Sequence, residues 1–123
     1  MDLLGPLPRT AARSEHLLVI VDCFSNMTRA IPVQRIDAEA IAAAILNYWV
    51  AAYGPPATVL SDNGPQFRST FFQGVCSLLL ISNRYFKTYH PQTNGQVERC
   101  NRTSVRQLQM YVEDHQDRWV ELV

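Results

Sequence analysis

The stretch Leu60-Ser61-Asp62-Asn63-Gly64-Pro65-Gln66-Phe67 is the most informative part of this chain of 123 residues. The β-branched and apolar run from Thr58 to Leu60 predicts a short strand, and the Asn-Gly-Pro that follows the aspartate predicts a turn. Asp62 is therefore expected at the carboxyl end of a strand, where α/β sheets place their sites. The alternative is that Asp62 serves only the turn, as aspartates before Asn-Gly often do.

A second acidic residue, Glu98, lies in the stretch His90-Pro91-Gln92-Thr93-Asn94-Gly95-Gln96-Val97-Glu98-Arg99-Cys100-Asn101, and a third, Asp2, opens the chain. Thirty-five residues, 63 to 97, separate Asp62 from Glu98. Three carboxylates on separate elements can hold two divalent metal ions, because Mg²⁺ prefers oxygen ligands. Two such ions roughly 4 Å apart can stabilise the attacking and the leaving oxygen of a phosphodiester.

Simpler roles stay open for each of these acids. Glu98 can be an acid of a first helical turn, favoured by the helix dipole. Asp2 can be a solvated residue near the terminus, and Asp22 is a rival for the place of the first acid.

The expected elements alternate in the manner of an α/β domain with a mixed sheet, and the length predicts one domain over residues 1–123. We expect strands at Asp2–Leu4, His16–Cys23, Met27–Val33, Thr58–Leu60 and Asn83–Phe86. We expect helices from a cap at Asp37 to a stop at Gly54, from Ser69 to about Leu80, and from about Gln96 to Glu113. A further helix is expected to begin at Trp119 and to be incomplete.

Charge is distributed unevenly although the formal net charge is zero. Between residues 84 and 110 a single acid, Glu98, faces five bases: Arg84, Lys87, Arg99, Arg102 and Arg106. Such a surface suits phosphate contacts, and the alternative is a solvated helix face. No apolar run approaches the roughly 20 residues of a membrane span, and no signal peptide is expected. Without Cys-x-x-Cys spacing, Cys23, Cys76 and Cys100 are predicted to be reduced, buried thiols of an intracellular protein.

Five segments together resemble the catalytic core of retroviral and LTR-retrotransposon integrases, the gypsy type in particular. They are Met1–Pro8, Val19–Asp22 with the following Phe24-Ser25, Tyr53–Pro56, Ser61–Phe67 and Tyr89–Arg99. The resemblance implies a ribonuclease-H-like fold, with a mixed sheet of three antiparallel strands and then parallel ones, flanked by helices. It also implies that Asp22 precedes a turn and takes no part in the metal site.

The resemblance further implies a role for individual residues. Asp2 would bridge two Mg²⁺ or Mn²⁺ ions, Asp62 would hold one of them and Glu98 the other. Asn63 and Asn101 would support this site. The residues expected to contact DNA are Lys87, Tyr89, Asn94, Arg99 and Arg102.

The implied activity is that of a metal-dependent polynucleotidyl transferase, which trims the 3′ ends of element DNA and joins them to target DNA. DNA would be the partner, with a homo-oligomer in the full-length protein, no membrane, and a nuclear location after passage through the cytoplasm. The alternative is a domesticated or decayed core that binds DNA or protein without turnover. A ribonuclease-H-like nuclease is disfavoured by the specific motifs around Asn94 and Glu98.

Three features depart from the family pattern. A single residue precedes Asp2, where the family has most of a strand, so we expect a core truncated at both ends. Gly74 lies inside an expected helix, where glycine costs about 1 kcal/mol relative to alanine. Leu80 stands where relatives often have glycine at the helix stop, so the turn there is expected to be strained.

Overall fold

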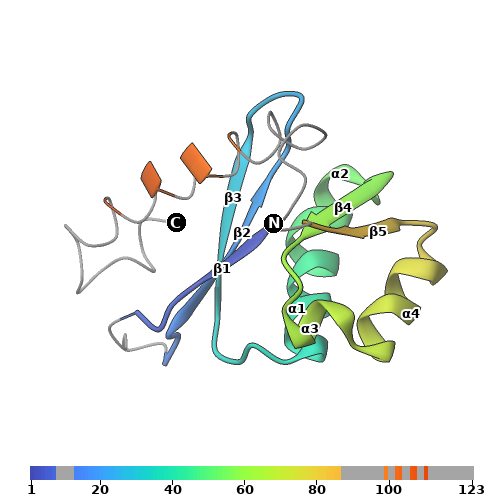
Figure 1. Cartoon of the computed structure of the whole chain (residues 1–123), viewed down its shortest axis with the longest axis horizontal. Helices are drawn as coiled ribbons and strands as arrows, with labels where there is room; N and C mark the ends of the chain where they lie inside the picture. Colours follow the sequence, from blue (N-terminus) through green and yellow to red (C-terminus); the bar gives the residue numbers. More distant parts are fainter. Residues whose placement is uncertain (8–12, 87–98, 100–101, 104–105, 108–109, 111–123) are drawn as a thin grey trace. The chain divides into compact units, whose positions relative to one another are not determined.

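The computed structural model describes residues 1–7, 13–86, 99, 102–103, 106–107 and 110 (Figure 1). The chain forms two compact units. The first combines Met1–Gln34 with Lys87–Val123, and the second is Arg35–Phe86. Each unit is described by itself below, and the expectation of one domain stays a prediction.

The first unit contains an antiparallel sheet in the order β1-β2-β3, built from β1 (Asp2–Leu4), β2 (His16–Val21) and β3 (Thr28–Val33). The continuous apolar run of β2 predicts a strand with no solvent-exposed face. β2 is the central strand of the sheet, as this prediction requires. Pro32 lies on β3 at the edge of this sheet, where its missing N–H is tolerated. The strand predicted to reach Cys23 ends at Val21, because Asp22 already closes the following turn.

The core of this sheet follows from the alternation of side chains along a strand. Leu17, Val19 and Val21 point to one face, where they form a buried cluster with Leu4. On the opposite face Leu18 and its register partner Ile31 are also buried. Asp2 lies opposite Val19, so its side chain shares the face of the Leu17 cluster.

The second unit opens with a helical segment from Ala38 to Tyr53. It consists of α1 (Ala38–Ile45), a π-helical turn η1 (Leu46–Val50) and α2 (Ala51–Tyr53). The predicted cap is confirmed, because Asp37 Oδ1 accepts a hydrogen bond from Ala40 N–H at 2.9 Å. The predicted stop is confirmed at Gly54, whose φ of 81° is a conformation that favours glycine. The π-helical turn was not predicted; it contains Trp49, which is buried against the Tyr53 ring.

A parallel pair of strands, β4 (Thr58–Ser61) and β5 (Ser82–Tyr85), follows in the same unit. Two helices connect them: α3 (Pro65–Arg68) and α4 (Thr70–Leu78). Ser69 was predicted to begin the second helix, and its Oγ caps α4 by accepting from Phe72 N–H at 3.1 Å. The short α3 was not predicted. It brings Phe67 into the core, where its ring meets that of Phe72 edge to face at 5.7 Å.

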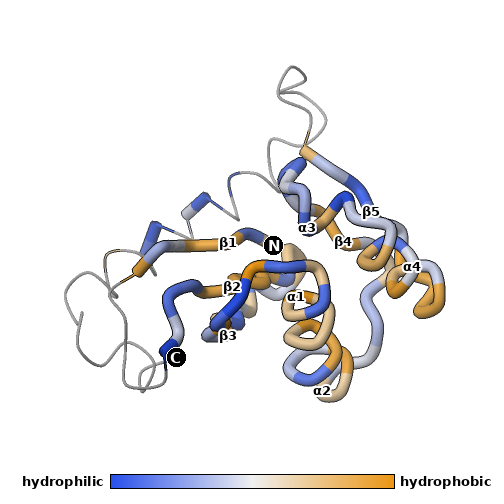
Figure 2. Tube along the Cα trace, turned by 90° about the horizontal axis from the view of Figure 1, so that it is seen from below, coloured by the Kyte–Doolittle hydropathy of each residue, from blue (hydrophilic) through white to orange (hydrophobic). Residues whose placement is uncertain are grey.

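The end of α4 confirms the expected strain at Leu80. Leu80 has a φ of 57°, in the left-handed region that non-glycine residues rarely adopt. Its side chain is 89% exposed, so burial does not compensate for this conformation. The apolar residues at this end of α4 appear in orange in Figure 2. Gly74, inside α4, has open space where a Cβ would lie.

The observed order, three antiparallel strands and then a parallel pair with helices, agrees with the predicted fold class. Six residues of the predicted helix Gln96–Glu113 are described, and all are helical: Arg99, Arg102, Thr103, Arg106, Gln107 and Met110. The predicted start of a helix at Trp119 lies outside the described residues. In the described part of the chain, every helix is too short or too polar to cross a membrane.

Candidate metal and nucleic-acid site

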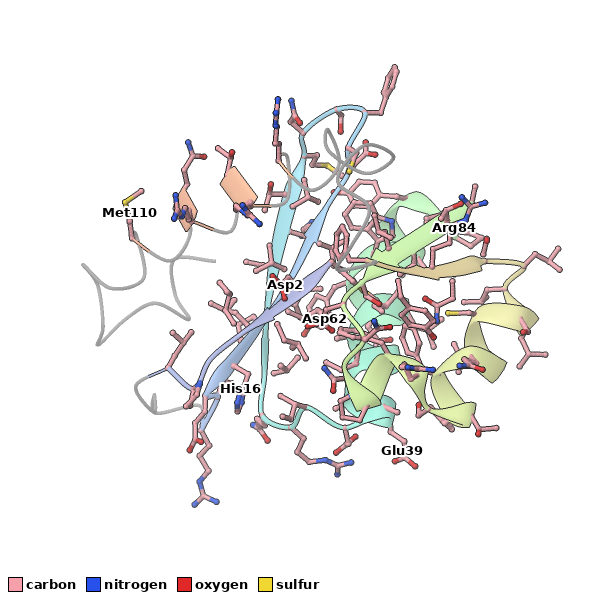
Figure 3. The ribbon with its side chains drawn as sticks, in the orientation of Figure 1. Asp2, His16, Glu39, Asp62, Arg84 and Met110 are labelled. Carbon is pink, nitrogen blue, oxygen red and sulfur yellow. The ribbon has the colours of Figure 1, made fainter. Side chains whose placement is uncertain are left out.

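Asp62 occupies the position predicted for it, directly after the parallel strand β4 (Figure 3). Ser61 before it is fully buried, and the Ser61 carbonyl accepts from Phe86 N–H at 2.9 Å. Asp62 itself is exposed, and its Oδ1 accepts from the backbone N–H of Gly64 at 2.9 Å. Within the described residues the Asp62 carboxylate has no other hydrogen-bond or ion-pair partner. The turn role and the ligand role of Asp62 are therefore compatible.

Asp2 lies on β1 and is half-buried, with its Oδ1 accepting from Leu3 N–H at 2.8 Å. Asp2 and Asp62 belong to different units, so their convergence stays a prediction. Glu98 and its supporting residue Asn101 lie outside the described residues. Among the residues that the structure describes, no group of three His, Cys, Asp or Glu side chains is arranged to hold a metal ion.

The chemistry of the described donors nevertheless fits a hard divalent cation. Asp62 offers carboxylate oxygens, which Mg²⁺ and Mn²⁺ prefer. One of these oxygens is held by a backbone N–H, as ligating carboxylates commonly are. The adjacent Asn63 is exposed, and its role as a supporting residue stays a prediction.

Asp22, the rival first acid, closes the turn between β2 and β3. Its carboxylate accepts from Phe24 N–H at 3.3 Å, from Ser25 N–H at 3.2 Å and from the Ser25 hydroxyl at 2.6 Å. The Ser25 hydroxyl, and then the Phe24 N–H, lower the pKa of Asp22 below its ordinary value. These bonds confirm that Asp22 is a turn residue.

A polar cluster that sequence reasoning missed joins β5 and α4 to the end of α3. We name it the Tyr85 clamp, and it consists of Phe67, Arg68, Gln73, Asn83 and Tyr85. The Phe67 carbonyl accepts from the Tyr85 hydroxyl at 3.0 Å and from Asn83 Nδ2 at 3.3 Å. Asn83 Nδ2 and Gln73 Nε2 donate to the Tyr85 hydroxyl at 3.0 and 3.4 Å. The Arg68 guanidinium lies 5.8 Å from the centre of the Tyr85 ring.

The sequence contains only a partial signal for this clamp, which shows that two of its residues share a face but not what they contact. Asn83 and Tyr85 are two residues apart on a strand, so they share a face. In the folded strand this face is half-buried, at Asn83 and Tyr85. The opposite face, with Ser82 and Arg84, is exposed.

The basic residues of the last described helix are on the surface. Arg99, Arg102 and Arg106 are helical and exposed, and on the predicted helix Gln96–Glu113 the spacings i, i+3 and i+7 would place them on one broad face. Arg84 is exposed on β5. The other residues expected to contact DNA, Lys87, Tyr89 and Asn94, lie outside the described residues.

The prediction for the cysteines was wrong at one position. Cys76 is buried, and its burial raises the pKa of the thiol. Cys23 is exposed, because it lies in the Asp22 turn beyond the end of β2. Cys100 lies outside the described residues.

Comparison with known proteins identifies relatives for most of the chain. The family described as "Integrase core domain" matches residues 1–91. The chain is 29% identical over 119 residues to the retrovirus-related Pol polyprotein from transposon 412 of Drosophila melanogaster, covering 97% of this chain and 10% of that protein. It is 42% identical over 89 residues to the Gag-Pol polyprotein of baboon endogenous virus, covering 72% of this chain and 5% of that protein. The chain thus spans a tenth or less of the length of these curated relatives.

Two solved structures share the fold. A chain of the simian T-cell lymphotropic virus intasome, solved by cryo-electron microscopy in complex with PP2A regulatory subunit B56 gamma, is 29% identical with a TM-score of 0.63. That match covers 92% of this chain and 41% of the viral one. The catalytic core domain of BIV integrase has a TM-score of 0.62 and 24% identity, covering 92% of this chain and 70% of that one. These likenesses confirm the ribonuclease-H-like fold, and the match over residues 1–91 shows that this chain belongs to the integrase core domain family.

Proposed function

We propose that this chain is the catalytic core of an integrase-type polynucleotidyl transferase, which processes 3′ DNA ends and joins them to target DNA. The observation that carries the proposal is the state of Asp62. Its carboxylate is exposed at the carboxyl end of a parallel strand, with one oxygen held by Gly64 N–H. An oriented carboxylate with unused acceptor capacity is suited to ligate a metal ion. Asp22, in a similar turn, already accepts three hydrogen bonds and has less acceptor capacity left.

Asp2, Asp62 and Glu98 would together hold two Mg²⁺ or Mn²⁺ ions. Bound divalent ions neutralise charge on a phosphodiester and on the oxygens that attack and leave. The chain's own contribution is position: the pairing of β4 with β5 holds the buried Ser61, so that the next residue projects from the end of the strand. No side chain is required to form a covalent intermediate.

DNA is the proposed substrate, and the exposed arginines of the last described helix support this proposal. Arg99, Arg102 and Arg106 can neutralise phosphates on one face, with Lys87, Tyr89 and Asn94 proposed as further contacts. One relative of known structure is described as part of an intasome. We accordingly propose that the full-length protein acts as a homo-oligomer, in the nucleus.

A titration with Mn²⁺ tests the metal site. In the full chain, we expect paramagnetic broadening of the NMR signals of Asp2, Asp62 and Glu98, with the Asn63 amide affected as a neighbour. Asp62→Asn should remove most of this broadening, whereas Asp22→Asn should leave it intact. Broadening that is absent, or that survives Asp62→Asn, would refute the proposed site. Metal binding without any DNA cleavage or joining would support a decayed core instead.

The salt dependence of DNA binding tests the arginine face. Arg102→Ala should weaken binding and reduce the slope of log K against log salt by about 1, the share of one phosphate contact. Arg106→Ala should have the smaller effect, because Arg106 is two turns from Glu98 and Arg102 is one. Arg29→Ala, which removes the same charge from an exposed position on β3, is the matched control. An unchanged slope for Arg102→Ala would exclude Arg102 from the interface.

A further inference from the structure

We infer that Gly64 is a positioning residue for the Asp62 carboxylate, and that its function is to leave space for that carboxylate. This inference rests on the proposed metal site at Asp62. Glycine is usually required in a turn because the backbone has a positive φ. Gly64 has a φ of −56° and a ψ of 144°, which any residue can adopt. The reason for glycine at this position is therefore steric.

The space that a side chain would need at position 64 is already filled. A Cβ built on Gly64 would lie 2.9 Å from Asp62 Oδ1 and 2.6 Å from Gln66 Nε2. Both distances are shorter than van der Waals contact, so something must move. The same Asp62 oxygen accepts from Gly64 N–H at 2.9 Å. Gly64 thus has two effects on the Asp62 carboxylate. Its N–H donates a hydrogen bond to the carboxylate, and its lack of a side chain leaves the space that the carboxylate occupies.

The backbone around Gly64 is anchored on both sides, so it cannot simply retreat from a clash. Before the loop, Ser61 is fully buried and its carbonyl is bound by Phe86 N–H. After the loop, Phe67 is fully buried, and its N–H donates to the Gly64 carbonyl at 3.1 Å. The Tyr85 clamp binds the Phe67 carbonyl as well.

With the backbone held, the side chains must yield. The Gln66 amide is the far end of a flexible side chain and can swing away at little cost. The Asp62 carboxylate has to shift away from position 64, which weakens its hydrogen bond from Gly64 N–H and changes the direction in which its oxygens point. Gly64→Ala should therefore misdirect Asp62 while the loop keeps its fold.

Gly64→Ala in the full chain, with Gly74→Ala as control, tests this inference. Both variants add one methyl group to a glycine, but the methyl group at position 74 enters open space. We expect Gly64→Ala to weaken Mn²⁺ binding about tenfold, the lower end of what loss of a group that orients a metal ligand costs. In the metal-free protein, the ¹³C carboxyl signal of Asp62 should shift. Gly74→Ala should change neither the affinity nor that signal.

The double variant Gly64→Ala/Gln66→Ala separates the two clashes. Removing the Gln66 side chain eliminates the contact at 2.6 Å but leaves the contact with Asp62. Mn²⁺ affinity should therefore stay low in the double variant. Recovery of the affinity would overturn the inference, because Gln66 would then be the group that requires glycine.

The remaining outcomes are also decisive. If Asp62→Asn abolishes Mn²⁺ binding while Gly64→Ala binds like the wild type, the inference about Gly64 fails and the proposed metal site stands. If Asp62→Asn leaves Mn²⁺ binding unchanged, the proposed metal site itself fails. A Gly64→Ala chain that does not fold would overturn the inference too, because glycine would then be a requirement of the loop and not of the carboxylate.

Discussion

Two aspartates in this chain, Asp22 and Asp62, each follow a strand and open a tight turn. The Asp22 carboxylate accepts three hydrogen bonds within its turn, from Phe24 and Ser25. Asp62 accepts one bond, from Gly64 N–H, among the described residues. Asp22 thus uses more of its acceptor capacity within its own turn, whereas the Asp62 carboxylate is oriented by a single bond and keeps more acceptor sites for a ligand.

The two turns also differ in what holds them. The Asp22 turn is closed by residues within five positions of the aspartate, with Asp22 N–H bonded to the Met27 carbonyl at 2.9 Å. The Asp62 turn is held by the buried Phe67 and by Tyr85, which is 18 residues further along the chain than Phe67. Because the Asp62 side chain is hardly needed to stabilise its own turn, it can be changed with little effect on the fold.

The largest expected effect is on activity, when Asp62 or Glu98 is replaced by the corresponding amide. Asp62→Asn should reduce Mg²⁺- or Mn²⁺-dependent strand transfer by about a hundredfold or more, since a catalytic metal contributes several kcal/mol to transition-state stabilisation. Glu98→Gln should act alike. Both are measured with labelled oligonucleotides in the protein that contains this core, with melting curves to check folding. Asp22→Asn is the matched control. A comparable loss of activity in all three variants would contradict the proposal that Asp62 binds the metal and Asp22 only closes a turn.

The support of the Asp62 turn by distant groups predicts an effect on stability. Tyr85→Phe removes the hydroxyl that binds the Phe67 carbonyl and accepts from Asn83. The free energy of unfolding, measured with urea, should fall by about 1–2 kcal/mol, the cost of losing partly buried hydrogen bonds. Tyr48→Phe, at an exposed tyrosine, is the control and should change nothing. A Tyr85→Phe chain as stable as the wild type would show that the clamp does not hold the loop.

A third turn, at Leu80, differs from the two aspartate turns because its hydrogen bonds join backbone groups only. Leu80 N–H donates to the Ser77 carbonyl at 3.1 Å, and Ile81 N–H to the Cys76 carbonyl at 2.8 Å. Leu80→Gly should raise the free energy of unfolding by about 0.5–1 kcal/mol, because relief of the left-handed strain exceeds the added entropy of the unfolded chain. Thermal unfolding measures the gain. As a control, Leu78→Gly in the last turn of α4 should lower the free energy of unfolding. A lower free energy of unfolding in Leu80→Gly as well would contradict the backbone strain at Leu80.

The smallest effect concerns the pH dependence of stability. The pKa of Asp22 in the folded chain is lower than its ordinary value of 3.8, chiefly because of the Ser25 hydroxyl. The ionised form is therefore favoured by folding, and its contribution is complete above the ordinary pKa and lost as the pH falls through the lowered one. Urea midpoints of the wild type should drop more steeply than those of Asp22→Asn as the pH falls below the ordinary pKa of 3.8 and through the lowered one. Parallel curves would show that the Asp22 bonds contribute nothing to stability.

Local sequence was enough to predict much of this protein. The cap at Asp37, the start of a helix at Ser69, the stop at Gly54, the central position of β2 and the strand before Asp62 all follow from nearby residues. Each depends on interactions within about four residues or on the run of apolar side chains along one strand. The motifs around Asp62 and Glu98 likewise indicated the family, which the match over residues 1–91 confirmed.

Other features were decided by how the folded chain packs, at short as well as at long separations in the sequence. The short α3 forms where Phe67 finds a place in the core beside Phe72, the π-helical turn contains the buried Trp49, and the Tyr85 clamp spans up to 18 residues. The steric requirement at Gly64 depends on where the folded loop places Asp62 and Gln66. No pattern of neighbours specifies such contacts, because they exist only once the strands and helices have packed.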